Sequence, residues 1–285
     1  MQTLFSALQH TRATLLPEDW KGFCRDLCLR HPIRELVHQE FFTRRSFDKP
    51  RGYAGDAVLL DYLYQGLHSQ QESPTPLGQG IYQYLSQQTS TRSLLGRRNL
   101  LAQWIDDTAQ RCPEPRILSV ACGHLREAHL SRAVQERRLG KFLALDQDVE
   151  SLAVVGREFG NLGVEKVPGS VKALLKGELR FDGMDFIYAS GLYDYLPQPV
   201  AIRLSRILFS MLRPGGRLLL ANYSDPAPDS SFKAYMEAFM DWWLLYRDEA
   251  EVREWSQDIP RAELAGQKLF RDDTGNLVYL ALTRR

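Results

Sequence analysis

The chain has 285 residues, of which 44% are hydrophobic and 25% charged, and its formal net charge is +1. This near-neutral balance gives no global field that would recruit nucleic acid or an anionic membrane, and no apolar run approaches the ~20 residues needed to span a bilayer. The N-terminal residues lack the basic and long apolar regions of a signal peptide, so we expect a cytoplasmic protein.

The four cysteines form neither a metal-binding pattern nor a disulfide framework. Cys24 and Cys28 are one helical turn apart, without a matching pair elsewhere in the chain. We therefore expect them to pack as small apolar residues, and we expect no bound metal.

Apolar residues at helical spacing indicate helices over residues 1 to about 45 and again over residues 81–109, with Arg97 and Arg98 on a polar face. Between them, residues 49–56 contain two glycines and a proline, which favour an irregular backbone. The charged and aromatic side chains of this loop either decorate the surface or contact a ligand, and we favour the ligand. We expect residues 1–110 to form a helical cap that includes this loop, and residues 111–285 to form a second domain.

Residues 116–146 are predicted to form a strand, a crossover helix and a second parallel strand. Two short apolar runs, within residues 116–124 and 141–146, bracket an amphipathic segment. Gly123 allows a ligand to approach the backbone, and Asp146 ends the second strand, where a carboxylate can accept both hydroxyls of a ribose. This pattern predicts a nucleoside-binding half-site; the alternative is an ordinary strand–helix–strand unit without a ligand. The turn lacks G-x-G-x-x-G, which disfavours a dinucleotide and hence a nicotinamide oxidoreductase.

The alternation of strands and helices continues to the C-terminus. Strands are expected at residues 164–167, 184–189 and 217–221, with helices at about 149–159 and 199–211. A long helix is expected to carry Tyr235, Phe239, Trp242, Trp243 and Tyr246, followed by a hairpin of residues 267–271 and 277–283. The pattern predicts a doubly wound α/β fold with an open, mostly parallel, seven-stranded sheet.

Over residues 116–285 the chain resembles the class I S-adenosylmethionine-dependent methyltransferases. Residues 117–125 resemble the glycine-rich first turn of that family, Asp146 its ribose-binding acid, and residues 212–218 the entrance to its fifth strand. Ser170 and Val171 resemble the segment that flanks the adenine, and residues 185–196 the fourth strand and substrate loop. The chain departs from the pattern at Ser119, which replaces the usual acid of the first strand, and at Ala121 and Leu125, which replace glycines.

A narrower resemblance rests on residues 49–56, 190–196 and 241–247, which together are similar to a bacterial subfamily of hydroxypalmitate methyl ester biosynthesis methyltransferases. The same type of fold includes azetidine-2-carboxylate synthases, which cyclise S-adenosylmethionine itself. The resemblance therefore implies S-adenosylmethionine as cofactor and a small-molecule substrate.

Three tyrosines are the expected catalytic residues. Tyr53 is expected to lie against the sulfonium, an attraction of ~0.5–2 kcal/mol, and Tyr193 and Tyr195 follow the fourth strand, where an acceptor must reach the methyl group. Either of the last two is equally well placed to be a core residue. Contacts to the cofactor are expected from Arg51, Asp56, Ala121, Gly123, His124, Asp146, Gln147, Ser170, Val171 and Ser190.

Two of these residues have expected partners on the methionine part of the cofactor. Arg51 is suited to pair bidentately with the carboxylate. Asp56 is expected to hold the amino group that Ser119 cannot hold. His124 is expected either to cover the methionine or to serve as a plain helix cap.

No general base stands out in the sequence. A carboxylate with a pKa near ~4 is already ionised at neutral pH, and an α-amine with a pKa near ~8 is partly neutral, so neither acceptor depends on a strong base. The sequence therefore favours methyl transfer to a small carboxylate or amine. The alternatives are a cyclase that forms azetidine-2-carboxylate and methylthioadenosine, and a non-catalytic nucleoside-binding module. The apolar N-terminal helices fit equally well against the sheet or against a second copy of the chain, as in a homodimer.

Overall fold

The computed structural model describes residues 1–65, 73 and 75–285. The chain divides into two compact units, which are residues 1–95 with 227–244 (unit 1) and residues 96–226 with 245–285 (unit 2). The boundary between these units lies inside one continuous helix, α7 (Thr89–Arg111). The sequence gives no sign of this division, because nothing interrupts the helical pattern at residue 95.

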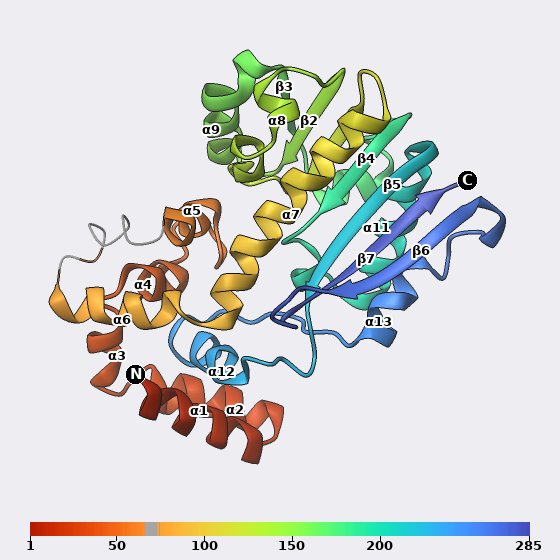
Figure 1. Ribbon diagram of the computed structural model, residues 1–285. Coiled ribbons are helices and arrows are strands. Elements are labelled where there is room, and N and C mark those ends of the chain that lie inside the picture. Colours follow the sequence, from red (N-terminus) through yellow and green to blue (C-terminus); the bar gives the residue numbers. More distant parts are fainter. Residues whose placement is uncertain (66–72, 74) are drawn as a thin grey trace. The chain divides into compact units, whose positions relative to one another are not determined.

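Unit 2 contains the predicted seven-stranded sheet, in the order β3-β2-β1-β4-β5-β7-β6 (Figure 1). The first five strands are parallel, and β7 lies antiparallel between β5 and β6. The strands are β1 (Arg116–Val120), β2 (Lys141–Asp146), β3 (Val164–Pro168), β4 (Met184–Ala189), β5 (Leu212–Tyr223), β6 (Leu264–Arg271) and β7 (Leu277–Arg284). The predicted fold class is confirmed.

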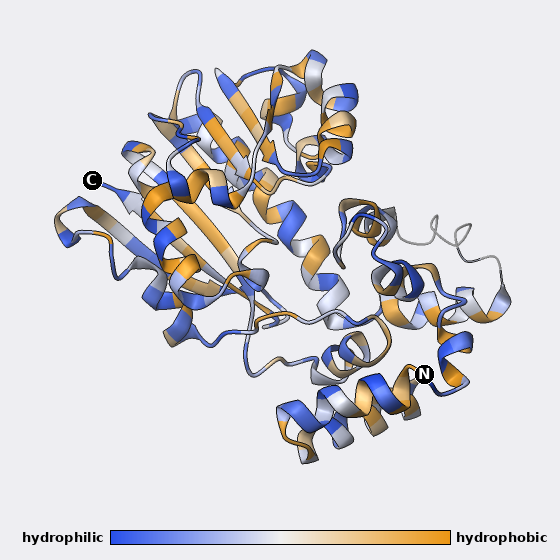
Figure 2. Ribbon diagram, turned by 180° about the vertical axis from the view of Figure 1, so that it is seen from behind, coloured by the Kyte–Doolittle hydropathy of each residue, from blue (hydrophilic) through white to orange (hydrophobic). Residues whose placement is uncertain are grey.

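Alternating side chains of the parallel strands enter two separate apolar layers, because successive residues of a strand point to opposite faces. On one face, Leu118 and Ile187 pack with α11; on the other, Ile117 and Phe186 pack with α7. The hydrophobic colouring of the central strands in Figure 2 reflects this burial on both faces. The helices of unit 2 are the later part of α7, α8 (Arg132–Gln135), α9 (Val149–Phe159), α10 (Val171–Lys176), α11 (Gln198–Ser210) and α13 (Glu249–Arg253). Its short 3-10 turns are η3 (Arg126–His129), η4 (Gly160–Leu162), η5 (Tyr193–Tyr195), η6 (Glu254–Ser256) and η7 (Arg261–Glu263).

The helical run expected after the first turn is much shorter than predicted, since only η3 and α8 lie between β1 and β2. The other predicted strands and helices of unit 2 and the C-terminal hairpin lie where the sequence placed them, with β5 beginning earlier than expected. Strand order reverses between β1 and β4, whose neighbours are β2 and β5. In open α/β sheets, the carboxyl ends of the strands at such a reversal form the usual place for a ligand.

Unit 1 is helical, and its apolar side chains are drawn from both of its chain segments. The ring of Phe5 stacks on that of Tyr235 with 4.7 Å between centroids, and Arg12 pairs with the buried Glu237. These contacts explain why residues 227–244 belong with the N-terminal helices. The helices of unit 1 are α1 (Gln2–Thr14), α2 (Pro17–Phe23), α3 (Ile33–Val37), α4 (Phe41–Asp48), α5 (Ala57–Gln65), α6 (Pro76–Ser86), the first part of α7, and α12 (Ser230–Phe239), with a π-helical turn, η1 (Cys24–Cys28).

The long helix expected to reach Tyr246 is wrong, because α12 ends at Phe239. Asp241 adopts a left-handed backbone with φ of 44°, and its carboxylate accepts a hydrogen bond from Trp243 Nε1 at 2.8 Å. The chain therefore turns at Asp241, and Trp242 packs in unit 1 beside Phe42, with 6.0 Å between ring centroids. Among the described residues, no helix combines the length and the apolar character needed to cross a membrane.

Candidate active site

The turn after β1 keeps a glycine-like backbone although two of its three key positions are not glycine. Ala121, Gly123 and Leu125 have φ angles of 55°, 54° and 53°. A left-handed conformation costs a non-glycine residue roughly 1–2 kcal/mol, and strain of this kind is typical of functional sites. The side chain of Leu125 is buried in the α7 face of the sheet, which offsets part of that cost. The departure from the glycine-rich sequence therefore leaves the path of the turn intact.

Asp146, at the end of β2, is joined directly to this turn. One carboxylate oxygen accepts the N–H of Gly123 at 2.8 Å, and the other accepts the N–H of Asp148 at 2.9 Å. Burial raises the pKa of Asp146, while these N–H groups and that of Gln147 act in the opposite direction. The carboxylate is thus fixed in position beside the first turn, and its oxygens retain lone pairs for a further donor.

Ser170 and Val171 lie next to Asp146, at the start of α10. Gly169 N–H donates to the carbonyl of Asp146 at 3.0 Å, and the Ser170 hydroxyl accepts the N–H of Ala173 at 3.3 Å. The positions that resemble an adenine-flanking segment are therefore brought beside the predicted ribose-binding acid. The structure gives Ser170 a helix-capping role in addition.

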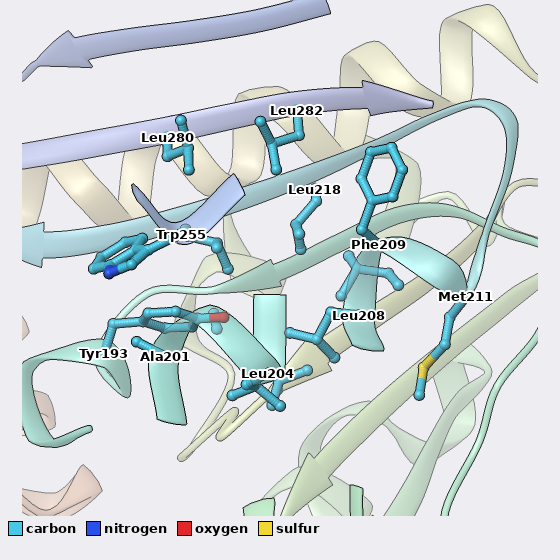
Figure 3. Close-up of a cluster of buried hydrophobic side chains, with 14 of the residues drawn as sticks. Tyr193, Ala201, Leu204, Leu208, Phe209, Met211, Leu218, Trp255, Leu280 and Leu282 are labelled. Atoms are coloured by element: carbon cyan, nitrogen blue, oxygen red, sulfur yellow. The ribbon is translucent and has the colours of Figure 1, made fainter. Parts of the chain in front are cut away.

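The residues after β4 divide into a buried and an exposed group. A 3-10 turn, η5, replaces the extended alternation expected there. Tyr193 is fully buried, its hydroxyl lies 2.9 Å from Ser205 Oγ, and its ring centroid is 4.5 Å from that of Trp255 (Figure 3). Burial raises the pKa of Tyr193. Tyr193 is therefore packed in the core, which is the alternative that the sequence left open, and its catalytic role stays a prediction. Tyr195 is 41% exposed and stays a candidate.

Ser190, at the end of β4, is tied to α7 by Arg97. The Arg97 guanidinium donates to the carbonyl of Ser190 at 2.6 Å and is buried, not on a polar helix face as expected. Its charge also lowers the pKa of two buried acids, Glu127 and Asp194, against the larger effect of burial. The sequence did not single out Arg97 or Glu127 as functional residues.

Glu127, in η3, lies beside the position of the missing first-strand acid. Ser119 of β1 is paired in register with Tyr188 of β4, and the Tyr188 hydroxyl donates to Glu127 Oε1 at 2.5 Å. Burial raises the pKa of Glu127, and the bond from Tyr188 and the charges of Arg97 and Arg98 oppose that rise. A carboxylate is therefore present at this end of β1 although strand residue 119 is a serine.

Asp194 belongs to a separate structural cluster that fixes the segment after β4. Its carboxylate accepts the N–H of Tyr223 at 2.7 Å, and burial raises the pKa of Asp194 to about 6. Arg247 holds the same segment, since it donates to the Tyr193 carbonyl at 2.8 Å and also to the Leu196 carbonyl. This clamp explains why the otherwise irregular residues 190–196 have a defined path.

The remaining predicted site residues lie in unit 1, except His124, which is buried in the first turn of unit 2. Asp56 is buried and engaged, since its carboxylate accepts two hydrogen bonds from Arg45 Nε, at 3.0 and 3.1 Å, and caps α5 through Leu59 N–H at 2.9 Å. Arg51 and Tyr53 are half-buried in the loop before it. Their contacts to a ligand, and that of Asp56, stay predictions.

No family model and no curated protein matches the chain. Solved structures do. A possible exported protein from Bordetella parapertussis aligns with a TM-score of 0.61 at 15% identity, over 87% of this chain and 94% of that one. The apo S-adenosylmethionine-dependent methyltransferase SibL aligns with a TM-score of 0.53 at 16% identity, over 86% and 70%. Magnesium protoporphyrin IX methyltransferase from Synechocystis PCC 6803, with bound S-adenosylhomocysteine, aligns with a TM-score of 0.51 at 12% identity, over 70% and 88%. The chain therefore has the fold of the S-adenosylmethionine-dependent methyltransferases.

Proposed function

We propose that the chain is an S-adenosylmethionine-dependent methyltransferase that acts on a small carboxylate or amine by in-line displacement. The observation that carries this proposal is the position of Asp146, whose carboxylate is held at the end of β2 by the N–H of Gly123, 2.8 Å away in the first turn. A fixed carboxylate beside a left-handed turn suits a ribose with an adjoining chain that lies along the backbone.

The residues of unit 2 fit this cofactor. Asp146 would accept the ribose hydroxyls. Ala121 and Gly123 both have left-handed backbone, and Gly123, which has no Cβ, permits close approach of the ligand. Ser170 and Val171, adjacent to Asp146 through the bond between Gly169 and Asp146, would flank the adenine. Gln147, His124 and Ser190 complete the proposed contacts.

The bound sulfonium would supply an electrophilic methyl group, so the chain needs to provide orientation more than acid–base chemistry. Alignment of the reacting groups is worth up to ~7–11 kcal/mol. The clamp of Arg97 on the Ser190 carbonyl, at 2.6 Å, keeps the end of β4 fixed where an acceptor would approach. Tyr195, which is 41% exposed, is the remaining tyrosine of that segment that can contact an acceptor.

The acceptor class follows from the groups available to take a proton. A carboxylate acceptor, as in the methyl ester subfamily that the sequence resembles, needs no base because it is ionised at neutral pH. An amine needs only modest help. A cytoplasmic location, the absence of nucleic-acid and membrane partners, and a homodimer stay predictions from the sequence.

Intramolecular cyclisation of S-adenosylmethionine is the second candidate, and the buried Glu127 favours it. Cyclisation requires the amine of the methionine to lose its proton before it attacks the carbon next to sulfur. Burial raises the pKa of Glu127, which makes its carboxylate a better proton acceptor than an exposed glutamate. The products, azetidine-2-carboxylate and methylthioadenosine, distinguish this reaction from methyl transfer.

Incubation of the purified protein with S-adenosylmethionine, followed by mass spectrometry, tests the proposal. We expect almost no turnover with S-adenosylmethionine alone, and release of S-adenosylhomocysteine when a panel of small carboxylates and amines is added. Asp146→Ala is the control, with an expected loss of cofactor affinity of roughly 1.5–3 kcal/mol, as for a charged hydrogen-bond acceptor. Rapid formation of methylthioadenosine without an acceptor would replace methyl transfer by the cyclase. Failure of the native protein to bind the cofactor would overturn both.

A further inference from the structure

The chain carries a buried acid next to the place where its first strand lacks one. Ser119, the penultimate residue of β1, is buried and pairs in register with Tyr188 of β4. The Tyr188 hydroxyl donates to Glu127 Oε1 at 2.5 Å, which fixes the orientation of that carboxylate. The acid is thus supplied by η3, on the other side of the first turn, instead of by the strand.

Positive charges act on the Glu127 carboxylate. Arg97 and Arg98, on consecutive positions of α7, lie near enough to lower the pKa of Glu127 against the effect of burial. Arg97 is itself buried and held by the Ser190 carbonyl. The Glu127 carboxylate, which only accepts hydrogen bonds, is therefore within electrostatic range of two guanidinium groups, which only donate them. This combination is complementary to the ammonium and carboxylate of a free α-amino acid.

We propose that Glu127 accepts the ammonium of the methionine part of S-adenosylmethionine, that Tyr188 positions Glu127 for this contact, and that Arg97 and Arg98 supply positive charge for the methionine carboxylate. This inference rests on the proposed function and assigns the part of the cofactor that Asp146 does not reach. In this proposal the acid comes from η3 instead of β1, and a tyrosine of β4 orients it.

Two other acids near the ends of the strands, and the acid of unit 1 that the sequence assigned to the amino group, already have hydrogen-bond partners within the chain. Asp146 is fixed by the N–H groups of Gly123 and Asp148, at the end of β2 where the ribose is proposed. Asp194 is fixed by Tyr223 N–H, within the cluster that Arg247 clamps. Asp56 of unit 1 pairs with Arg45 and caps α5. Glu127 differs from these acids because it is buried, is oriented by the hydroxyl of Tyr188, and is affected by the charges of two arginines.

Two ligands separate a contact with the amino acid part from a contact with the nucleoside. S-adenosylhomocysteine carries the α-amino acid, whereas methylthioadenosine has the same nucleoside without it. Calorimetric titration of both ligands into the native protein and into Glu127→Gln measures the two affinities. We expect the substitution to lower the affinity for S-adenosylhomocysteine by at least about tenfold, the usual effect of losing a charged hydrogen-bond partner. The affinity for methylthioadenosine should stay within about twofold of the native value.

Three further variants make the result interpretable. Asp146→Ala should weaken the binding of both ligands. Glu136 is an exposed acid of the same unit, so Glu136→Gln should weaken the binding of neither. Tyr188→Phe keeps the Glu127 carboxylate but removes its hydroxyl donor, so we expect a smaller, selective loss for S-adenosylhomocysteine. This variant also keeps the proposal testable if Glu127→Gln fails to fold, which a thermal melt would reveal.

The outcomes are distinct. The proposal is overturned if the native protein binds both ligands and Glu127→Gln binds S-adenosylhomocysteine normally, or loses both ligands to the same extent. If Glu127→Gln does not fold, Tyr188→Phe decides the question. The proposal is overturned if Tyr188→Phe binds both ligands as the native protein does, or if it loses affinity for both ligands to the same extent. If the native protein binds neither ligand, the proposed function itself fails.

Discussion

At the scale of single residues, the buried carboxylates differ in what offsets the cost of their burial. Glu127 accepts a tyrosine hydroxyl and lies near two arginines. Glu40, in unit 1, accepts the backbone N–H groups of Phe42 and Thr43, at 2.8 and 2.7 Å, at the start of α4. Burial is the largest effect at both residues and raises the pKa of Glu127 and of Glu40. A raised pKa couples the protonation of these acids to the stability of the fold.

Glu40 gives a prediction with a defined sign. Burial raises the pKa of Glu40 from an ordinary value of 4.5 to about 7. Between these values the folded chain retains a proton that the unfolded chain has released, so rising pH favours unfolding. Relative to Glu40→Gln, the native protein should lose up to about 1.4 kcal/mol of unfolding free energy for each pH unit across this window. Chemical denaturation at a series of pH values measures the difference.

The reference variant is Glu18→Gln, because the Glu18 side chain is 84% exposed in the same unit. Its unfolding free energy should follow that of the native protein at every pH. A constant difference between the native protein and Glu40→Gln from pH 4.5 to 7 would contradict a raised pKa for Glu40.

The site residues that the sequence could predict are those whose role depends on position along a strand. Asp146 was identified because it ends β2, and its contact with the first turn bears out that placement. Glu127, for which we propose a contact with the cofactor, was not predicted because it lies in a short 3-10 turn with no periodicity, and its partner Tyr188 is distant in the chain. Tyr193 lies in the core because a turn after β4 directs its side chain there.

At the scale of elements, apolar runs predicted the strands well because both faces of the central sheet are buried. Helix ends were harder to predict. The aromatic spacing through Trp242 resembles that of a helix, yet the left-handed Asp241, with φ of 44°, ends that pattern. Aspartate tolerates this conformation better than most residues, which is the signal that could have corrected the prediction.

The loop before α5 provides a matched test of how an element is held in place. Gly52 and Gly55 have φ angles of 84° and 73°, but a Cβ at Gly55 would overlap the indole ring of Trp242, whereas a Cβ at Gly52 would meet no atom within 4 Å. We expect Gly52→Ala to cost roughly 1–2 kcal/mol of unfolding free energy from backbone strain alone. Gly55→Ala should cost about 1–3 kcal/mol more because of the overlap. Thermal and chemical denaturation compare the two, and equal losses would show that Trp242 yields without cost.

At the scale of the whole molecule, the chain builds two compact units from four segments, and α12 returns to the N-terminal unit. Asp146, Gly123 and Glu127 belong to unit 2, whereas Arg51 and Tyr53 belong to unit 1. The sequence predicted a cap and a sheet domain but not the return of α12, because that return depends on contacts such as Phe5 with Tyr235 between distant segments. A ligand contact by Arg51 of unit 1 is therefore a prediction separate from the contacts of unit 2.

Amide hydrogen exchange with and without S-adenosylhomocysteine tests the ligand contacts of each unit separately. The ligand should slow exchange at residues 121–125 and 146–148 in any case. If Arg51 pairs bidentately with the ligand carboxylate, exchange at residues 52–56 should slow as well, and Arg51→Lys should abolish that second effect, because a lysine cannot form the planar two-pronged contact. Arg25→Lys, at a side chain that is 74% exposed in the same unit, is the matched control and should behave as the native protein does. Protection confined to unit 2 in the native protein would remove Arg51 from the site. The methionine carboxylate would then depend on charges of unit 2, of which Arg97 and Arg98 are the proposed source.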